Sequence, residues 1–273
     1  LCRCLCAVCI SFSSSSALPP FSETAPVHSR GDAADDCCIW VHPAVPESSV
    51  VIGTDKNRRS GGLVVYALSG EILQYTDDPG LNNVDIRYDF PFGKTTGAII
   101  AASRRTNNSI ALYTIDPATR RLKKVEARTI NTGPAYGCCL YRDRRNNRFH
   151  YFVNDKKGNI EQWELLPAKN GTVDARKRRS FSVGGGCEGC VADDATGIVF
   201  LGEEEYGIWR FSADPKAPFS PQLIDSVSGP RLTADVEGLT LYTKDDESGY
   251  LIASSQGSDR FVVYKRTYPH DYI

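Results

Sequence analysis

Two carboxylates stand where an inner strand is expected to begin. Asp235 and Glu237 flank one valine in LTADVEG, and the segment that follows, LTLY, is apolar and β-prone. Clustered carboxylates repel one another and raise each other's pKa, so several acids at one place need a positive partner. Oxygen donors from several segments, without a matching set of His or Cys, favour Ca²⁺ over zinc. These residue types predict a calcium site if the fold gathers further acids around this pair.

The elements that would gather such acids recur along the chain. Each unit is an apolar strand, a polar loop and a strand centred on an aromatic, as in VVIGTDKNRRSGGLVVYAL and GIVFLGEEEYGIWRF. The aligned aromatics, 46 to 55 residues apart, are Tyr66, Tyr113, Trp163, Trp209 and Tyr264. A recurrence of this length built from several strands is typical of propeller blades, and a non-repeating β-sandwich is the alternative. We therefore predict an all-β propeller of four-stranded antiparallel blades.

Blade geometry predicts which residues meet. Because the strands of a blade alternate in direction, the start of each inner strand and the loop between its second and third strands share one end of the propeller. At the other end, the loops RDRRNN, ADDATG and TKDDESG resemble plain turns, in which we expect Asp193–Asp194 and Asp245–Asp246 to be solvated. The first end should form one cleft from Asp35–Asp36, Asn82–Asn83, Tyr136, Glu188, Asp235, Glu237, Asp55–Lys56, Arg104–Arg105, Asp155–Lys156 and Glu203–Glu205.

Three cations, one per blade, accompany the acids of this cleft. With calcium bound, Lys56, Arg105 and Lys156 would suit a small, highly anionic ligand that carries several phosphate groups. The alternative is that they only neutralise the acids as surface ion pairs. Nucleophilic catalysis has little support, because there is no G-x-S-x-G elbow, VGGGCEG does not precede a helix, and the four histidines do not cluster. A metal-activated water fits these residues better.

Composition and charge limit the class of protein. The 273 residues are 41% hydrophobic and 24% charged, as in a soluble globular protein, and the net charge of −1 argues against nucleic-acid binding. The opening LCRCLCAVCISFSSSSALPP resembles the back half of a secretory signal, with Ala17 near a cleavage point, and its apolar part is too short to span a membrane. We expect residues 1–20 to be a leader remnant, residues 21–273 to be the folded domain, and the protein to be secreted.

The cysteines fall into two groups. Four of the ten lie in the expected leader, and the others lie in or beside strand-like segments. Cys187 and Cys190 have the spacing of a redox or zinc half-site, but no second pair at zinc spacing accompanies them. We interpret this pair as buried, small hydrophobic side chains. Disulfides remain open, since pairing cannot be deduced from the sequence.

Longer segments resemble one known family. GDAADDCCIWVHP, IGTDK, LNNVDIRYDFPFG, AASRR, YGCCLY, FVNDKKGNIEQWEL, EGCVADDATGIVFLGEEEYGIW and LTADVEGLTLY are similar, in order and spacing, to the β-propeller phytases from about Glu23 to Tyr264. The resemblance implies a six-bladed propeller and a calcium-dependent 3-phytase. Such an enzyme is a phosphomonoesterase that hydrolyses phytate (myo-inositol hexakisphosphate) or calcium phytate to lower inositol phosphates through a metal-activated water. We expect a monomer when the propeller is complete.

The resemblance also implies roles for individual residues, carried over by motif. Phosphate groups would bind Lys56, Arg105 and Lys156, beside the cleft tyrosine Tyr136. A structural calcium would be held by Asp36 and the backbone carbonyls of Cys37 and Val84. Alignment alone favours Glu204 over Glu203 and Glu205 as a ligand. The calcium ligands of the cleft would be Glu23, Asp35, Glu188, Glu204, Asp235 and Glu237, and of these Asp35, Glu188, Asp235 and Glu237 would act in catalysis.

The chain departs from the family pattern at three places. Cys37 stands where the family tends to have Pro, and Asn57 stands where a second lysine usually follows Lys56. The sequence stops after the fifth unit, so we expect a propeller truncated after about five blades, unstable or inactive alone, with a natural product about two blades' worth of strands longer. Two other functions stay open: a calcium-stabilised propeller that binds anionic ligands or partner proteins without turnover, and hydrolysis of a different phosphate ester.

Overall fold

The chain folds into antiparallel sheets with very little helix. The computed structural model describes residues 22–273, so the expected leader lies outside the described residues. The helical elements in this range are three short 3₁₀ segments, Pro46–Ser48, Lys169–Gly171 and Gln256–Ser258. Between residues 22 and 273, no helix has the length and apolarity needed to cross a membrane. The predicted all-β class is confirmed.

Each sheet consists of strands that follow one another in the chain. Blade 1 contains β1 (Ala34–Trp40), β2 (Val50–Asp55), β3 (Gly62–Ala67) and β4 (Ile72–Asp77). Blade 2 contains β5 (Leu81–Phe92), β6 (Thr95–Arg104), β7 (Ser109–Asp116) and β8 (Arg121–Lys124), with β9 (Ile130–Asn131) paired to β7. Blade 3 contains β10 (Cys138–Asp143), β11 (Arg148–Asn154), β12 (Asn159–Pro167) and β13 (Val173–Ser182). Blade 4 contains β14 (Cys187–Asp193), β15 (Ile198–Glu203), β16 (Gly207–Ser212) and β17 (Gln222–Ser226), and blade 5 contains β18 (Val236–Thr243), β19 (Gly249–Ser255) and β20 (Arg260–Lys265).

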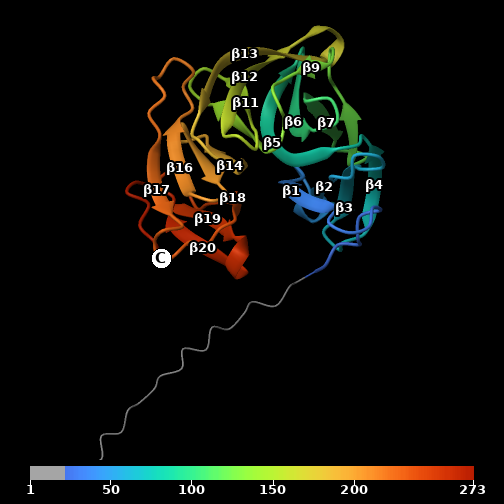
Figure 1. The fold of residues 1–273 in the computed structure, drawn as a ribbon. Coiled ribbons are helices and arrows are strands. Elements are labelled where there is room, and N and C mark those ends of the chain that lie inside the picture. The colour runs from blue at the N-terminus through green and yellow to red at the C-terminus, as the bar shows by residue number, and fades with distance from the viewer. Residues whose placement is uncertain (1–21) are drawn as a thin grey trace, which may run out of the picture.

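The five sheets are arranged around an axis as the blades of a propeller (Figure 1). The first strand of each blade lies innermost, since β1 contacts β5, β5 contacts β10, β10 contacts β14, and β14 contacts β18. In the described range, blades 1, 3 and 4 have the predicted four strands, blade 2 has four and the short β9, and blade 5 has three. Figure 1 shows the first and fifth blades on either side of the open part of the arc. The propeller predicted from the repeat is therefore confirmed.

Apolar side chains of the repeat fill the spaces between neighbouring blades. Four buried clusters join blades 1 and 2, 2 and 3, 3 and 4, and 4 and 5. The aligned tyrosines Tyr66, Tyr113 and Tyr264 are at most 3% exposed, and each lies on the third strand of its blade. Tyr113 packs in the cluster between blades 1 and 2, and Tyr264 in the cluster between blades 4 and 5. Burying one such large side chain stabilises the fold by roughly 1.5–3 kcal/mol. The repeat therefore encodes contacts between blades, which hold the inner strands in place.

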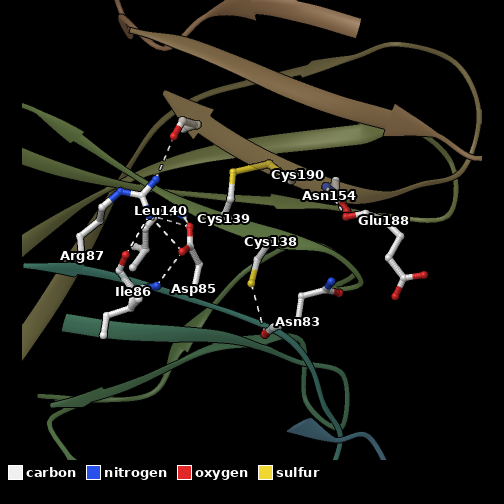
Figure 2. Close-up of a disulfide and its surroundings, with 11 residues drawn as sticks. Asn83, Asp85, Ile86, Arg87, Cys138, Cys139, Leu140, Asn154, Glu188 and Cys190 are labelled. Atoms are coloured by element: carbon white, nitrogen blue, oxygen red, sulfur yellow. Dashed lines mark hydrogen bonds and ion pairs between the residues drawn. A yellow bond between two sulfur atoms is a disulfide. The ribbon is translucent and has the colours of Figure 1, made fainter. Parts of the chain in front are cut away.

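A polar network joins the inner strands of blades 2, 3 and 4 in the channel (Figure 2). The Arg87 guanidinium donates to Asp85 at 3.0 Å, to Asp194 at 3.0 Å and to the Ala192 carbonyl at 3.0 Å. Asp85 in turn accepts the backbone N–H of Leu140 at 2.8 Å. The expectation that Asp194 is a solvated turn residue is therefore wrong, because its carboxylate is held inside the channel by an arginine two blades away.

Asp193 is also buried, contrary to expectation. Its side chain is 3% exposed and receives two hydrogen bonds of 2.7 Å from the Arg266 guanidinium, which is itself buried. Arg266 follows β20, so this bidentate pair fastens the last strand of blade 5 to blade 4. The turn composition of ADDATG concealed this role, because the arginine lies 73 residues further along the chain.

A disulfide joins Cys139 on β10 to Cys190 on β14 (Figure 2). Their Cα atoms lie 5.4 Å apart, so the bond links the inner strands of blades 3 and 4. Cys187 is a free, buried thiol, as expected, but the interpretation of Cys190 as an unpaired hydrophobic side chain is wrong. The partner was not predictable, since its proximity depends on how two blades pack.

Removing this disulfide should lower stability without unfolding the propeller. The bond closes a loop with a sequence separation of 51 residues. Restricting the unfolded chain in this way contributes about 2–4 kcal/mol. We expect the Cys139→Ala/Cys190→Ala variant to lose that amount of free energy of unfolding in a urea titration. Unchanged stability of the double variant beside the oxidised parent would contradict the expectation.

His150 should make the fold sensitive to mild acid. The side chain is 1% exposed on β11, and its Nδ1 has no hydrogen-bond partner in the described structure. Burial lowers its pKa to about 4, although Glu164 and Asp143 act in the opposite direction. The unfolded chain, with an ordinary His pKa of about 6.5, therefore takes up the proton first. Stability should fall as pH drops from about 6.5 to about 4, by up to about 3 kcal/mol.

The measurement is urea unfolding of the parent and of His150→Phe across this pH range. The variant keeps a planar ring against Tyr141, on which His150 stacks. The free energy of unfolding of the variant should lack the part of the pH dependence that comes from uptake of one proton by His150. If the free energy of unfolding of the two proteins changes with pH at the same slope, other titratable groups cause the acid sensitivity.

Candidate active site

Four of the predicted acids, Asp35, Asp36, Glu188 and Glu237, lie in β-bulges at the starts of the inner strands. In each bulge, two residues of the inner strand oppose a single residue of the second strand. A bulge bends its strand and re-aims the side chains. Because it recurs at the same point in four blades, the residues within it occupy equivalent positions around the axis. They are Asp35–Asp36 in β1, Asn82–Asn83 in β5, Glu188–Gly189 in β14 and Glu237–Gly238 in β18.

Two glycines allow these bulges to pack directly against one another. A Cβ atom at Gly137 would lie 1.9 Å from the Glu188 carbonyl oxygen, and one at Gly189 would lie 1.7 Å from the Glu237 carbonyl oxygen. Any other residue would therefore separate the inner strands of blades 3, 4 and 5. Sequence reasoning did not identify these positions, although each glycine stands directly beside a predicted site residue.

The predicted cations Arg105 and Lys156 lie over the ring of Tyr136. The Lys156 Nζ is 4.3 Å from the ring centroid, and the Arg105 guanidinium carbon is 5.3 Å from it. Cation–π contacts of this kind hold a charge in place without neutralising it. Among the ion pairs of residues 22–273, none involves Arg105 or Lys156. Both cations are therefore available to an anionic ligand.

The third predicted cation is engaged differently. The Lys56 ammonium lies 2.7 Å from Asp35 and 3.0 Å from Asp32. It therefore neutralises part of the acidic cluster, which matches the ion-pair alternative for this one residue. An anionic ligand could recruit Lys56 only if another positive charge replaced it beside Asp35.

Glu188 lies at the centre of the acidic cluster. Burial raises its pKa to about 7, with Asp35 and Glu237 acting in the same direction and contacts with Tyr136 and Asn82 opposing them. The pKa of Glu237 is raised by burial and then by repulsion from Glu204, Asp35 and Asp235. These carboxylates come from blades 1, 4 and 5, so the structure brings together acids that lie up to 202 positions apart in the chain. Their mutual repulsion favours any bound cation.

The three consecutive glutamates after β15 have different surroundings. Glu203 accepts the indole N–H of Trp209 at 2.7 Å, so its carboxylate is committed within its own blade. Glu204 has a buried Oε1 without a hydrogen-bond partner in the described structure. Glu205 is exposed, and a hydrogen bond with Asp235 raises its pKa. The geometry therefore leaves Glu204 and Glu205 facing the cluster, and motif alignment favours Glu204 among the three glutamates.

Asp36 lies at the second predicted calcium site, beside the acidic cluster. Its carboxylate accepts the backbone N–H of Cys37 at 2.8 Å and that of Val84 at 3.1 Å. Burial raises its pKa to about 6, while these two hydrogen bonds act in the opposite direction. The three residues assigned to a structural calcium are thus close together. In the described structure, Cys37 and Val84 contact the Asp36 carboxylate through their backbone N–H groups.

Glu23 is not brought to the cleft. A Cβ atom at Gly70 would lie 2.0 Å from the Glu23 carbonyl oxygen, and the next residue but one, Ala25, donates its N–H to Gly70 at 2.9 Å. Gly70 lies in the turn after β3, at the opposite end of that strand from Lys56. Strand β3 separates the two ends by about 20 Å. The assignment of Glu23 as a ligand of the cleft is therefore corrected, because motif order does not fix where a segment outside the sheets lies.

The donors of the cleft suit a hard cation but do not form a closed shell. Within residues 22–273, no three His, Cys, Asp or Glu side chains are placed so that they could already hold a metal ion. The buried, unpartnered Glu204 Oε1 and the repulsion between neighbouring carboxylates nevertheless call for positive charge here. Carboxylate oxygens without nitrogen or sulfur ligands fit calcium. A cavity of about 830 Å³ runs from Asp35 and Glu237 along the inner strands, so there is room beside these acids.

Comparison with known proteins agrees with this picture. A family model for phytase matches residues 4–273. A 3-phytase from Bacillus subtilis is 40% identical over 258 residues, covering 92% of this chain and 67% of that protein, so the chain spans about two thirds of its length.

Solved structures share the fold at low sequence identity. A protein of unknown function from Desulfotomaculum acetoxidans has a TM-score of 0.56 at 12% identity, covering 88% of this chain and 70% of that one. A periplasmic gluconolactonase from Pseudomonas aeruginosa has a TM-score of 0.52 at 12% identity, covering 82% and 66%. These structures support the fold alone. The family match extends over nearly the whole sequence, and the chain belongs to the phytase family of phosphomonoester hydrolases.

Proposed function

We propose that this protein hydrolyses phytate as a calcium-dependent 3-phytase, releasing phosphate and lower inositol phosphates. Family membership and the similarity to a 3-phytase support the substrate. The observation that carries the proposal is the meeting of acids from three blades with two unpaired cations at one end of the channel. An acidic face alone would repel a polyphosphate, and a basic face alone would not need a metal.

Arg105 and Lys156 would bind phosphate groups of the substrate. They come from blades 2 and 3 and both lie over the Tyr136 ring, so one ligand with several phosphate groups could contact both. Arginine and lysine recognise phosphate by charge-assisted hydrogen bonds, and those bonds strengthen as charge builds on the phosphoryl oxygens. Burial and the contact with Glu188 raise the pKa of Tyr136, which keeps its hydroxyl protonated and able to donate.

Calcium would be held by the carboxylates that face one another across the bulges. The ligands we propose are Asp35, Glu188, Glu204, Asp235 and Glu237, with Glu205 beside them, while Asp36 with Cys37 and Val84 would hold a structural ion. Bound calcium supplies charge neutralisation for the acids and lowers the pKa of a coordinated water. The new oxygen–phosphorus bond comes from one water molecule, the ester bond breaks, and the inositol oxygen leaves as a hydroxyl after taking up a proton.

The protein is proposed to act outside the cytoplasm. The leader-like opening of the sequence supports this, and so does the Cys139–Cys190 disulfide, since such bonds persist mainly in oxidising compartments.

One assay tests the proposed function. Inorganic phosphate released from phytate by the intact protein is measured with calcium and then with an excess of chelator. Release that requires calcium is the expected result. Binding of phytate without any release would favour the non-catalytic alternative, and release that ignores the chelator would contradict the role of calcium.

A further inference from the structure

Asn82 occupies the bulge position that carries an acid in three other blades. Asp35, Glu188 and Glu237 are its structural equivalents in β1, β14 and β18. Asn82 is fully buried, at 0% exposure, and lies between the acidic cluster and the phosphate-binding cations. A neutral amide at an otherwise acidic position requires a reason.

Every polar atom of this amide has a partner. Its Nδ2 donates to the Glu188 carboxylate at 2.5 Å and to the Asn83 side-chain oxygen at 2.9 Å. Its Oδ1 accepts from the Arg105 guanidinium at 2.6 Å. The opposite orientation would set the amide oxygen against the Asn83 and Glu188 oxygens, and the amide NH2 against the Arg105 guanidinium, so only one orientation satisfies the contacts.

The amide therefore separates a carboxylate from a guanidinium while ordering both. Arg105 and Glu188 both contact this one amide, at 2.6 and 2.5 Å. In its absence their opposite charges would draw them toward each other, and a pair between them would leave neither side chain free for its own ligand. A carboxylate at this position would attract Arg105 more strongly than the amide does, and it would repel Glu188. A carboxamide is the side chain of this size that donates to one and accepts from the other.

We propose that Asn82 is a positioning residue of the cleft, which holds Glu188 for a cation and Arg105 for an anionic group of the substrate. The inference rests on the proposed function of the cleft. The role of Asn82 is tested by ligand affinities and the hydrolysis of phytate by phosphate release, so the two proposals can fail separately.

The test uses Asn82→Ala and Asn82→Asp in the intact protein. Calorimetric titration with Ca²⁺ alone measures whether Glu188 is still positioned to bind a cation. Titration with myo-inositol hexakissulfate in the presence of Ca²⁺ measures whether Arg105 is still positioned to bind an anionic group. The sulfate ester carries six negative charges and no phosphorus, so it is not hydrolysed by this chemistry. We expect Asn82→Ala to weaken both affinities about tenfold, the effect of losing a hydrogen bond to a charged group. Asn82→Asp should weaken binding of the hexakissulfate further, because its carboxylate competes with the ligand for Arg105.

A double-mutant cycle separates positioning from a general effect on structure. In an Arg105→Ala background, replacing Asn82 should change the hexakissulfate affinity less than twofold. Equal losses with and without the Arg105 side chain would overturn the inference, and so would affinities of both Asn82 variants within twofold of the parent. If Asn82→Ala does not fold, the isosteric Asn82→Asp replaces it in the same double-mutant cycle.

Gln162 provides a matched control. Its amide is also fully buried, accepts from the Arg179 guanidinium at 2.7 Å and donates to the Ala213 carbonyl at 2.8 Å, away from the cleft. Gln162→Ala should lower stability and leave both affinities unchanged. If the parent protein binds the hexakissulfate but releases no phosphate from phytate, the proposed hydrolysis fails while the Asn82 cycle can still be read.

Discussion

Replacing Glu188 with Gln is expected to lower phosphate release from phytate at least about 100-fold. Loss of an outer partner of a metal ligand typically costs 10- to 100-fold, and loss of a ligand itself should cost no less. Glu188 is 6% exposed, accepts from Asn82 and shares the cluster with Asp35 and Glu237. The glutamine keeps the size of the side chain and removes only its charge. The measurement is kcat for phosphate release at saturating calcium.

Two observations distinguish this effect from unfolding. Calcium affinity of Glu188→Gln, measured by titration, should fall together with kcat, while the urea midpoint stays near or above that of the parent because a repelled buried charge has been removed. Glu161→Gln is the control, because this glutamate pairs with Lys177 and Trp163 on blade 3 and has no contact with the cleft. A Glu188→Gln variant that retains more than half of the parent kcat would exclude Glu188 from the reaction.

Replacing Arg87 with Met is expected to lower the free energy of unfolding by about 3–5 kcal/mol, the usual cost of leaving buried charges unpaired. Its side chain is 15% exposed and neutralises Asp85 and Asp194 together, so the variant would leave two carboxylates in the channel without a cation. Methionine preserves most of the packing of the aliphatic part of arginine. Urea unfolding followed by tryptophan fluorescence measures the change.

Two further variants test whether the network or the side chain itself is responsible. Arg128→Met removes an exposed ion pair with Asp174, in which the arginine is 55% exposed, and should cost less than about 1 kcal/mol. The triple variant Asp85→Asn/Arg87→Met/Asp194→Asn removes the whole set of charges and should recover part of the loss. A loss for Arg87→Met no larger than that for Arg128→Met would show that the channel network contributes little.

Much of the fold could be predicted because the repeat is local. The spacing of Tyr66, Tyr113, Trp163, Trp209 and Tyr264 reflects one strand per blade, and the loops between strands are short enough to be recognised by their polar residues. The location of the cleft also followed, since alternation of strand direction places the starts of the inner strands at one end. Placement of Asp193, Asp194 and Cys190 did not follow, because their partners Arg266, Arg87 and Cys139 lie 51 to 107 positions away.

The β-bulges explain why other features of the site could not be predicted from the sequence. Composition indicates acids near a strand start, but a bulge exists only when two strands pair, so the equivalence of Asn82 with Asp35, Glu188 and Glu237 cannot be deduced from one strand alone. The same holds for Glu205, whose relation to Asp235 depends on the packing of blades 4 and 5. Glu23 was misplaced for the converse reason, since no strand pairing constrains the segment before β1.

The amino-acid sequence by itself determined the blade architecture and the family, because both depend on residue types repeated at regular intervals. Only the tertiary structure decided which acid meets which cation, which cysteines bond and which amide lies between Glu188 and Arg105. Those contacts depend on distances of about 3 Å between strands of different blades, and such distances arise from packing rather than from position along the chain.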